Sequence, residues 1–334
     1  MTDLSVCIPA RNEEFLALTV QDVIQHARAD TEVIVVMDGY WADPPVPDHP
    51  RVIVLHEPVS IGQRAATNKA VQVASGKWVM KLDAHCSMEE NFDAVLLADA
   101  QEHWTTLPVM QNLHAYDWVC EKGHHIYQGP VGPCRWPEQK RGQSDAEYAL
   151  IPRCQLPTHK EIMWDRKAGP NSWTYRFDTE PHFQYWGELK KRPRIAPDFC
   201  ETMSLQGSCF MIRRDRYLAL NLCDETWGSW GSQGIEVAVK SWLSGGQVVV
   251  NLKTHYGHMF RTQKGFRHPY PLSEGQVEFA KAQARKLFIS DFPGKIRPFS
   301  WLLEHFWPIP GWEIEDLERI KDAESDPVLH RQPA

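Results

Sequence analysis

Residues 77–86 read Lys-Trp-Val-Met-Lys-Leu-Asp-Ala-His-Cys, an apolar run that ends in an Asp-x-His triplet. A run of this length is typical of a buried strand. Because side chains alternate along an extended chain, Asp83 and His85 project to the same side, where one cation could join them. A carboxylate and an imidazole together suit Mn²⁺ better than Mg²⁺, which prefers oxygen ligands. The same spacing also arises by chance, so the metal hypothesis needs support from other segments.

The strand at 77–82 is the last of a series in which strand-length apolar runs alternate with helix-length segments. The other expected strands cover 4–8, 32–37 and 51–56, and the expected helices cover 15–29 and 63–74. This βαβ alternation predicts an α/β fold with a Rossmann-like, mostly parallel central sheet. Ligands of such sheets bind beyond the carboxyl ends of the strands, so a site is expected near residues 9–14, 38–43 and 83–86.

The stretch 115–200 lacks this regularity. It is rich in Pro, Gly, Trp, Arg and Lys, and we interpret it as an irregular insertion with a few short strands. Regular structure is expected to return after it. The expected elements are a strand at 207–213, a helix at 235–244, a strand at 247–252 and two amphipathic helices, at 274–288 and 313–323, packed outside the core.

Composition excludes some classes of protein. The chain has 334 residues, 43% of them hydrophobic, with 36 Lys+Arg against 43 Asp+Glu and a formal charge of -7. These values disfavour wholesale disorder, and the acidity disfavours coating nucleic acid by bulk charge. No apolar run approaches the roughly 20 residues of a membrane span. With an N-terminus that lacks an h-region and with eight scattered cysteines, we expect a cytoplasmic protein with reduced thiols.

Three further segments carry candidate ligand-binding residues. Asp38 ends an expected strand and could accept hydrogen bonds from a base or ribose, or could instead cap a helix or form an Asx-turn. Gly62 and Arg64 open an expected helix, a natural position for a diphosphate. His258 follows another strand and offers a second imidazole, with Arg261 nearby for phosphate.

Six motifs in order resemble those of GT-A glycosyltransferases, whose fold binds nucleotide-diphospho-sugars. They are Ile8-Pro-Ala-Arg-Asn-Glu-Glu14, Met37-Asp-Gly-Tyr40, Asp83-Ala-His85-Cys86, Gly207-Ser-Cys-Phe210, Trp230-Gly-Ser-Gln-Gly-Ile-Glu236 and Gly257-His-Met-Phe-Arg261. The broad resemblance is to glycosyltransferase family two. The Asp-x-His, Trp and Gly-His-x-Phe-Arg motifs are most similar to those of polypeptide N-acetylgalactosaminyltransferases.

The resemblance implies roles for particular residues. Asp83, His85 and His258 would hold Mn²⁺ or another divalent cation, which bridges the diphosphate of a UDP-sugar donor. Trp230 would belong to a mobile active-site loop. The residues that would lie against the donor are Pro9, Arg11, Asp38, Arg64, Asp83 and Arg261 for the nucleoside diphosphate, and Gly207 and Ser208 for the sugar.

The resemblance also implies a domain organisation. A GT-A domain would cover residues 1–265, and a C-terminal helical extension would cover 266–334. Within the first, residues 1–114 would form the nucleotide-sugar-binding half, residues 115–200 the loop-rich insertion, and residues 201–265 the acceptor and catalytic half.

One departure bears on the chemistry. Where the polypeptide-directed family continues its Trp motif with Gly-Gly-Glu-Asn, this chain has Gln233 at the Glu position. A neutral amide cannot act as a general base. Either the reaction retains anomeric configuration without an enzymic base, or Asp224, Glu225 or Glu236 supplies one. Glu236 also suits the helix N-terminus where it stands. Trp230, Gln233 and Glu236 are therefore the catalytic candidates.

The insertion holds a possible second metal site. Cys120, His124, His125, Cys134 and Cys154 could form a zinc knuckle, which would stabilise a segment with little core of its own. Their spacing is irregular, and scattered thiols with surface histidines are the alternative.

The acceptor is inferred from charge. Basic clusters at 190–194 and 253–268 could guide a polyanion, and the motif pattern resembles family-two enzymes of bacteriophages that modify their genomes. We therefore expect 5-hydroxymethylcytosine or a related hydroxymethylated base in phage DNA as acceptor. A polysaccharide, a lipid-linked glycan or a peptide is the alternative; the peptide is disfavoured because no lectin module or membrane anchor is recognisable. The sequence indicates no oligomeric state.

Two other function classes remain open. A nucleotidyltransferase would use a similar sheet, but it would normally carry a Gly-rich signature after the first strand, where this chain has Pro9-Ala-Arg-Asn-Glu13. A non-catalytic binder of nucleic acid or glycan on the same scaffold would fit Gln233.

Overall fold

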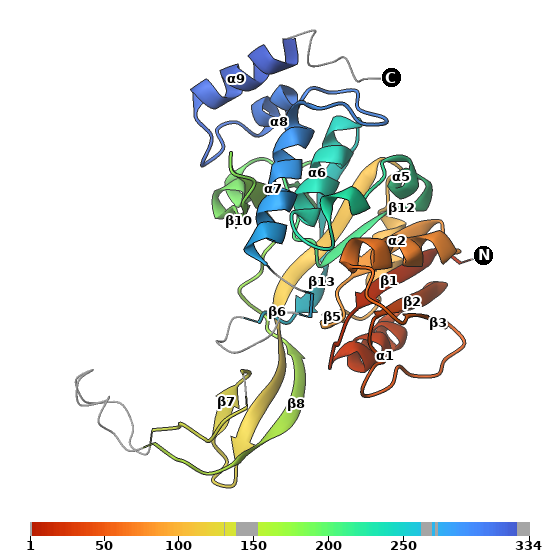
Figure 1. Cartoon of the computed structure of the whole chain (residues 1–334), viewed down its shortest axis with the longest axis vertical. Coiled ribbons are helices and arrows are strands. Elements are labelled where there is room, and N and C mark those ends of the chain that lie inside the picture. The colour runs from red at the N-terminus through yellow and green to blue at the C-terminus, as the bar shows by residue number, and fades with distance from the viewer. Residues whose placement is uncertain (1, 130, 138–152, 262–268, 271–272, 326–334) are drawn as a thin grey trace.

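A mixed β-sheet runs through the computed structural model, which describes residues 2–129, 131–137, 153–261, 269–270 and 273–325 (Figure 1). The order of its main strands is β11 (Phe199–Glu201), β13 (Gln247–His258), β6 (Trp104–Cys120), β12 (Cys209–Arg213), β4 (Trp78–Leu82), β1 (Leu4–Ala10), β2 (Thr31–Asp38) and β3 (Val52–Glu57).

The N-terminal half of the sheet is parallel, as the alternation predicts. β1 pairs in parallel with β2 and β4, and β2 pairs in parallel with β3. β12 then enters antiparallel between β4 and β6, so the whole sheet is mixed rather than mostly parallel. β1 is buried along its whole length, which explains why it reads as a nearly continuous apolar run with Ser5 as its one polar residue.

Helices cover this half of the sheet. α2 (Gln63–Val73) packs on β1 and β2, while α1 (Leu16–His26) contacts β2 and the short β5 (Cys86–Met88). In Figure 1, α2 lies above β1–β3 and α1 lies below them. We call the main sheet and the helices packed on it the body. Besides α1 and α2, the body includes α3 (Phe92–Ala98), α5 (Arg214–Ala219), η2 (Glu225–Trp227) and α6 (Gln233–Leu243).

The insertion is more regular than expected. β6 is 17 residues long and continues beyond the body, where it pairs antiparallel with β7 (His125–Tyr127) and β8 (Thr158–Arg166). We call β7, β8 and the distal part of β6 the arm, because they project from the body (Figure 1). Sequence periodicity missed it because polar and charged residues occupy both faces of β8. The rest of the insertion includes η1 (Gly187–Lys191) and a hairpin of β9 (Tyr175–Phe177) and β10 (Phe183–Tyr185).

The C-terminal helices belong to the main core, which corrects the expectation that they pack outside it. They are α7 (Glu274–Ile289), α8 (Phe299–Phe306), which the sequence did not predict, and α9 (Ile314–Ser325). Phe288 of α7 stacks on Phe299 of α8 with ring centroids 4.2 Å apart, and both rings contact Phe177 from β9. The proposed domain boundary at residues 265/266 lies outside the described residues.

The structure also bears on membrane-spanning helices and on the cysteines. No helix within the described ranges combines the length and the apolar character needed to cross a membrane. The eight cysteines are all buried, and all are free thiols.

Candidate active site

Asp83, His85 and His258 meet where three strands end or begin. Asp83 follows β4, His85 precedes β5, and His258 ends β13, whose antiparallel pairing with β5 sets His258 opposite Cys86. One ligand atom of each lies within 4.8 Å of those of the other two. His258 Nε2 is 3.3 Å from Asp83 Oδ2, and the two imidazole centroids are 4.9 Å apart. The structure thus brings together the three residues expected to share a cation.

The protonation states at this cluster suit a cation. Burial by itself would raise the pKa of the Asp83 carboxyl, but the Lys81 ammonium, His258 and His85 together hold that pKa well below its usual range. Burial lowers the pKa of His258, and the nearby Asp83 carboxylate only partly offsets it. An ionised carboxylate and a neutral imidazole are the forms that bind metals.

The nitrogens of His258 supply an independent test of fit. Both Nδ1 and Nε2 are buried, and neither makes a hydrogen bond of standard geometry among the described residues; Nε2 lies 3.3 Å from the Asp83 carboxylate that would share the cation. Leaving buried polar atoms unsatisfied is costly, and most such atoms in proteins are paired. A cation held between His258, His85 and Asp83 would remove this cost, so the residues present fit a divalent metal.

Two residues that support the cluster were not assigned these roles from the sequence. Lys81 contacts the Asp83 carboxylate and donates to the Gly207 carbonyl at 2.6 Å, although only 1% of its side chain is exposed. Glu13 Oε1 lies 3.3 Å from His85 Nδ1, and Glu13 Oε2 accepts from Arg261 at 2.5 Å. A carboxylate behind a ligating imidazole fixes its orientation. Arg261, expected to contact phosphate, is thus also tied to Glu13.

A cavity of about 270 Å³ opens beside the cluster. Pro9 and Arg261 line it together with Asp83, His85 and His258. Arg11 stands outside this lining: its Nε donates to the Pro269 carbonyl at 2.9 Å, and its guanidinium lies 5.2 Å from the centre of the Tyr40 ring.

Asp38 binds a loop 22–24 residues further along the chain, whereas the helix cap and the Asx-turn considered from the sequence would be local contacts. Its carboxylate accepts hydrogen bonds from the backbone N–H groups of Ile61 at 2.6 Å and Gly62 at 3.0 Å, and from the Ser60 hydroxyl at 2.8 Å. Asp38 is fully buried. It therefore anchors the loop that leads into α2, and the expectation that it contacts the nucleoside is corrected.

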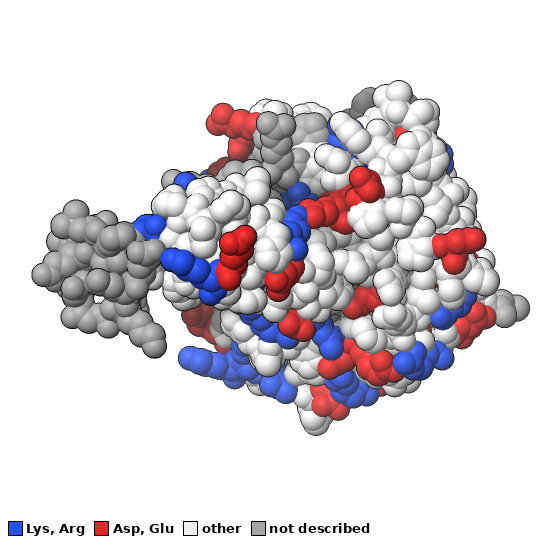
Figure 2. Space-filling view, turned by 90° about the horizontal axis from the view of Figure 1, so that it is seen from below, with Lys and Arg blue, Asp and Glu red and all other residues white. Residues whose placement is uncertain are grey.

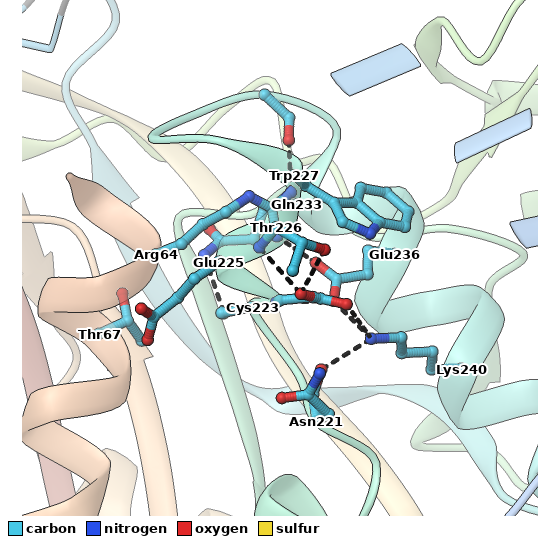
Figure 3. Close-up of polar contacts among 12 residues, drawn as sticks. Arg64, Thr67, Asn221, Cys223, Glu225, Thr226, Trp227, Gln233, Glu236 and Lys240 are labelled. Atoms are coloured by element: carbon cyan, nitrogen blue, oxygen red, sulfur yellow. Dashed lines mark hydrogen bonds and ion pairs between the residues drawn. The ribbon is translucent and has the colours of Figure 1, made fainter. Parts of the chain in front are cut away.

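Arg64 and Glu236 form a buried ion pair, in contrast to both expected roles (Figure 3). Arg64 also donates to the Gly231 carbonyl at 2.6 Å, and Glu236 accepts from Lys240 at 2.8 Å. Neither Arg64 nor Glu236 is exposed. Arg64 thus does not reach a diphosphate, and Glu236 cannot serve as an accessible base, because each side chain turns into the contact between α2 and α6.

The other two candidate bases also point elsewhere. Asp224 accepts from Thr226 N at 3.0 Å and begins η2, while Glu225 accepts from Asn68 Nδ2 at 2.9 Å. Asp224, Glu225 and Glu236 are all absent from the described residues that line the two cavities beside the cluster.

A second cavity, of about 350 Å³, adjoins the first and shares Asp83 and Trp230 with it. Gly207, Ser208 and Gln233 line it, as expected for a sugar site. The Ser208 hydroxyl is 2.7 Å from the Tyr256 hydroxyl, and Gln233 Nε2 donates to the Cys223 sulfur at 2.9 Å. Trp230 is positioned to contact ligands on both sides.

Gly234 closes the wall of this cavity against the backbone, which gives a first prediction. A Cβ at this position would collide with the Leu205 carbonyl oxygen. We expect Gly234→Ala to lower the free energy of unfolding by about 1–3 kcal/mol, the usual range for overpacking. Gly187→Ala is the control, since a Cβ there meets no atom within 4 Å. Equal denaturant midpoints for the two variants would contradict the close approach of α6 to Leu205.

Two members of the first basic cluster make hydrogen bonds inside the protein. Lys190 donates to the Asn171 carbonyl at 2.8 Å, and Arg192 donates to the carbonyls of Phe306 and Pro308, both at 2.6 Å. On the face shown in Figure 2, Lys and Arg side chains are interspersed with Asp and Glu. Members of the second cluster at 264, 267 and 268 lie outside the described residues.

Comparison with known proteins places the fold. Residues 5–149 match the model of the glycosyl transferase family 2. The chain is 23% identical over 240 residues to the putative polypeptide N-acetylgalactosaminyltransferase 13 of Drosophila melanogaster, covering 71% of this chain and 34% of that protein. It is 23% identical over 256 residues to N-acetylgalactosaminyltransferase 7 of Rattus norvegicus, covering 74% and 32%. The chain thus spans about a third of the length of these relatives.

A solved structure agrees with this. The crystal structure of GalNAc-T7 with UDP, GalNAc and Mn²⁺ superposes with a TM-score of 0.55 at 17% identity, covering 96% of this chain and 55% of that one. The fold is therefore GT-A-like, with a mixed central sheet and a C-terminal helical part.

Proposed function

We propose that the protein is a metal-dependent glycosyltransferase that moves an N-acetylhexosamine from a UDP-sugar to a hydroxyl of a peptide or glycan. The observation that carries the proposal is the Asp83–His85–His258 cluster between two adjoining cavities. The relatives named above are N-acetylgalactosaminyltransferases, and the similar structure was solved with UDP, GalNAc and Mn²⁺.

The geometry suggests a separate role for each of these residues. Asp83, His85 and His258 would hold the divalent ion, which when bound neutralises the charge that develops on a departing diphosphate. Glu13, whose Oε1 lies 3.3 Å from His85 Nδ1, would orient that imidazole. Lys81 holds the Asp83 carboxylate and the Gly207 carbonyl together, which couples the metal site to the wall of the sugar cavity.

We also propose that transfer retains the anomeric configuration. An inverting displacement needs a base for the acceptor hydroxyl, and Gln233 cannot supply it. Among the described residues that line the 350 Å³ cavity, Asp83 is the only carboxylate, and it is assigned to the metal. The lining also includes His182, whose Nδ1 lies 3.2 Å from Asp178 Oδ2 and whose Nε2 lies 3.0 Å from the Lys281 ammonium. Because both of its nitrogens are occupied, a mechanism without an enzymic base fits this lining.

The peptide or glycan acceptor replaces the hydroxymethylated DNA that the sequence led us to expect. The relatives include an enzyme named for polypeptide acceptors, and the 190–194 cluster is occupied with internal hydrogen bonds. The DNA acceptor has no support from either observation, so it becomes an outcome of the test below.

A panel assay tests donor, acceptor and stereochemistry together. With Mn²⁺, we expect transfer from a UDP-N-acetylhexosamine to Ser/Thr peptides or oligosaccharides, seen as a mass increase and UDP release. The α-linked donor should give an α-linked product by NMR. Plain and hydroxymethylcytosine-containing DNA serve as the comparison acceptors. Transfer to modified DNA alone would overturn the acceptor proposal, and a β-linked product would overturn retention.

The same assay separates the other function classes. A nucleotidyltransferase would release pyrophosphate rather than UDP. A non-catalytic binder would show a UDP-induced or acceptor-induced thermal shift without UDP release, and that result would contradict the proposed activity.

A further inference from the structure

Three cysteines and one histidine converge near the far end of the arm, away from the Asp83 cluster (Figure 1). Cys120 ends β6, and His124 lies just before β7, after a turn in which Gly123 N donates to the Cys120 carbonyl at 2.8 Å. Cys134 and Cys154 come from two neighbouring segments. Their Sγ atoms, Cys120 Sγ and one His124 nitrogen all lie within 4.8 Å of one another.

Backbone pairing sets these cysteines side by side. Cys134 N donates to the Leu156 carbonyl at 2.9 Å, and Cys154 N donates to the Trp136 carbonyl at 2.9 Å. These two bonds run in opposite directions between antiparallel segments. The convergence is therefore built into the backbone and does not depend on the rotamer of one exposed side chain.

The spacing matches a tetrahedral ion. With ordinary zinc–sulfur and zinc–nitrogen bonds, the edges of a tetrahedral site are about 3.8 Å between sulfurs and about 3.6 Å between sulfur and nitrogen. Cys134 Sγ lies 3.6 Å from His124 Nδ1. Bringing the remaining ligand atoms from within 4.8 Å to these edges requires only small side-chain shifts.

Backbone N–H groups face two of the sulfurs, and an aromatic ring holds the imidazole. Backbone N–H groups of Lys122 and His124 hydrogen-bond to the Cys120 sulfur, and that of Trp136 hydrogen-bonds to the Cys134 sulfur. Such contacts stabilise and orient metal-bound sulfur. The His124 ring stacks on Trp136 with centroids 5.6 Å apart and planes 15° apart, which holds its orientation.

Among the described residues, the tip of the arm has only a small apolar cluster. Its buried apolar cluster consists of Cys120, Cys134 and Cys154, with Ile126 and Leu156 packed against them. Clusters this small seldom hold a segment together without a metal or a cross-link. A disulfide would pair two of the thiols, leave the third unmatched and give His124 no role.

We propose that Cys120, His124, Cys134 and Cys154 bind a structural zinc ion. The three sulfurs and one nitrogen fill a tetrahedron, so no position remains open for substrate. His125, also considered from the sequence, stays outside the set: its Nδ1 is 3.2 Å from Asp117 Oδ2, and half of its side chain is exposed. This site is independent of the proposed glycosyl transfer.

Metal analysis of the full chain tests the proposal. The protein is purified in a reducing buffer from zinc-supplemented cells and gel-filtered into metal-free buffer, and zinc is measured by mass spectrometry. We expect about one zinc per chain to stay bound, since structural zinc contributes directly to folding. Replacing zinc by Co²⁺ should give an intense thiolate-to-cobalt charge-transfer band and the visible bands of tetrahedral cobalt.

Matched variants locate the ion. His124→Ala and Cys134→Ser should lose most of the zinc, whereas His125→Ala and Cys200→Ser should keep it; Cys200 is a buried free cysteine of β11. If a variant fails to fold, the cobalt spectrum still tests the site, because it is measured on the unmodified protein. Wild-type protein without stoichiometric zinc, an octahedral cobalt spectrum, a disulfide among these cysteines, or full zinc retention in His124→Ala and Cys134→Ser would each overturn the site.

Discussion

Replacing His258 by alanine is expected to reduce UDP-sugar-dependent transfer by on the order of a hundredfold to a thousandfold, the usual cost of losing a group that stabilises developing charge. The imidazole is buried, and its Nε2 lies 3.3 Å from the Asp83 carboxylate with which it would share the ion. Removing it leaves Asp83 and His85, which offer too few ligands to hold the ion tightly. The loss should therefore appear both in turnover and in the Mn²⁺ concentration required.

The control for this variant lies on the same strand. His255 also belongs to β13, but its Nδ1 pairs with Glu89 at 2.9 Å and it stands outside both cavities. We expect His255→Ala to keep transfer and the Mn²⁺ requirement unchanged. Mn²⁺ binding by calorimetry in the presence of UDP gives a readout that does not need the acceptor. Full activity with unchanged Mn²⁺ affinity in His258→Ala would remove this residue from the metal site.

Glu236→Gln is expected to lower the free energy of unfolding by about 3–5 kcal/mol, the usual cost of removing one partner from a buried ion pair. The Glu236 carboxylate pairs with Arg64 and also accepts from Lys240 at 2.8 Å and from Asp224 N at 3.0 Å (Figure 3). Without its charge, the Arg64 guanidinium stays buried and uncompensated. Urea denaturation monitored by tryptophan fluorescence measures the change.

Two further variants separate a structural role from a catalytic one. The triple variant Arg64→Met/Glu236→Leu/Lys240→Met should recover part of the stability, because well-packed apolar groups can replace a buried ionic cluster as a whole, and Lys240 is buried against the same carboxylate. Glu102→Gln, which breaks an exposed ion pair with Arg213, should change stability little. If Glu236→Gln leaves unfolding unchanged but abolishes transfer, Glu236 acts as a base after all and the buried-pair interpretation is wrong.

At the metal cluster, the sequence predicted which residues come together. Alternation along a strand places Asp83 and His85 on one side, and both follow one apolar run. His258 is 173 residues away from His85, yet it too follows an expected strand, and the motif order linked the three. The Cys120, His124, Cys134 and Cys154 set was visible only as a possibility, since its irregular spacing does not reveal which segments are neighbours.

The same reasoning was wrong about residues whose role depends on a distant partner. Arg64 opens a helix, as expected, but its side chain meets Glu236 from another helix instead of a diphosphate. Asp38 ends a strand, as expected, but the Ser60–Gly62 loop occupies its carboxylate. In each case the position along the element was predicted and the direction of the side chain was not.

By itself the sequence determined the βαβ half of the fold, the strand that ends at Asp83, and the types of residue offered to a cation. These follow from hydrophobic periodicity and side-chain alternation, which act over a few residues. Only the tertiary structure decided that β12 runs antiparallel between β4 and β6, that the C-terminal helices share the core, and that Glu236 is buried. Burial and charge pairing depend on contacts between segments far apart in the chain, and no local pattern encodes them.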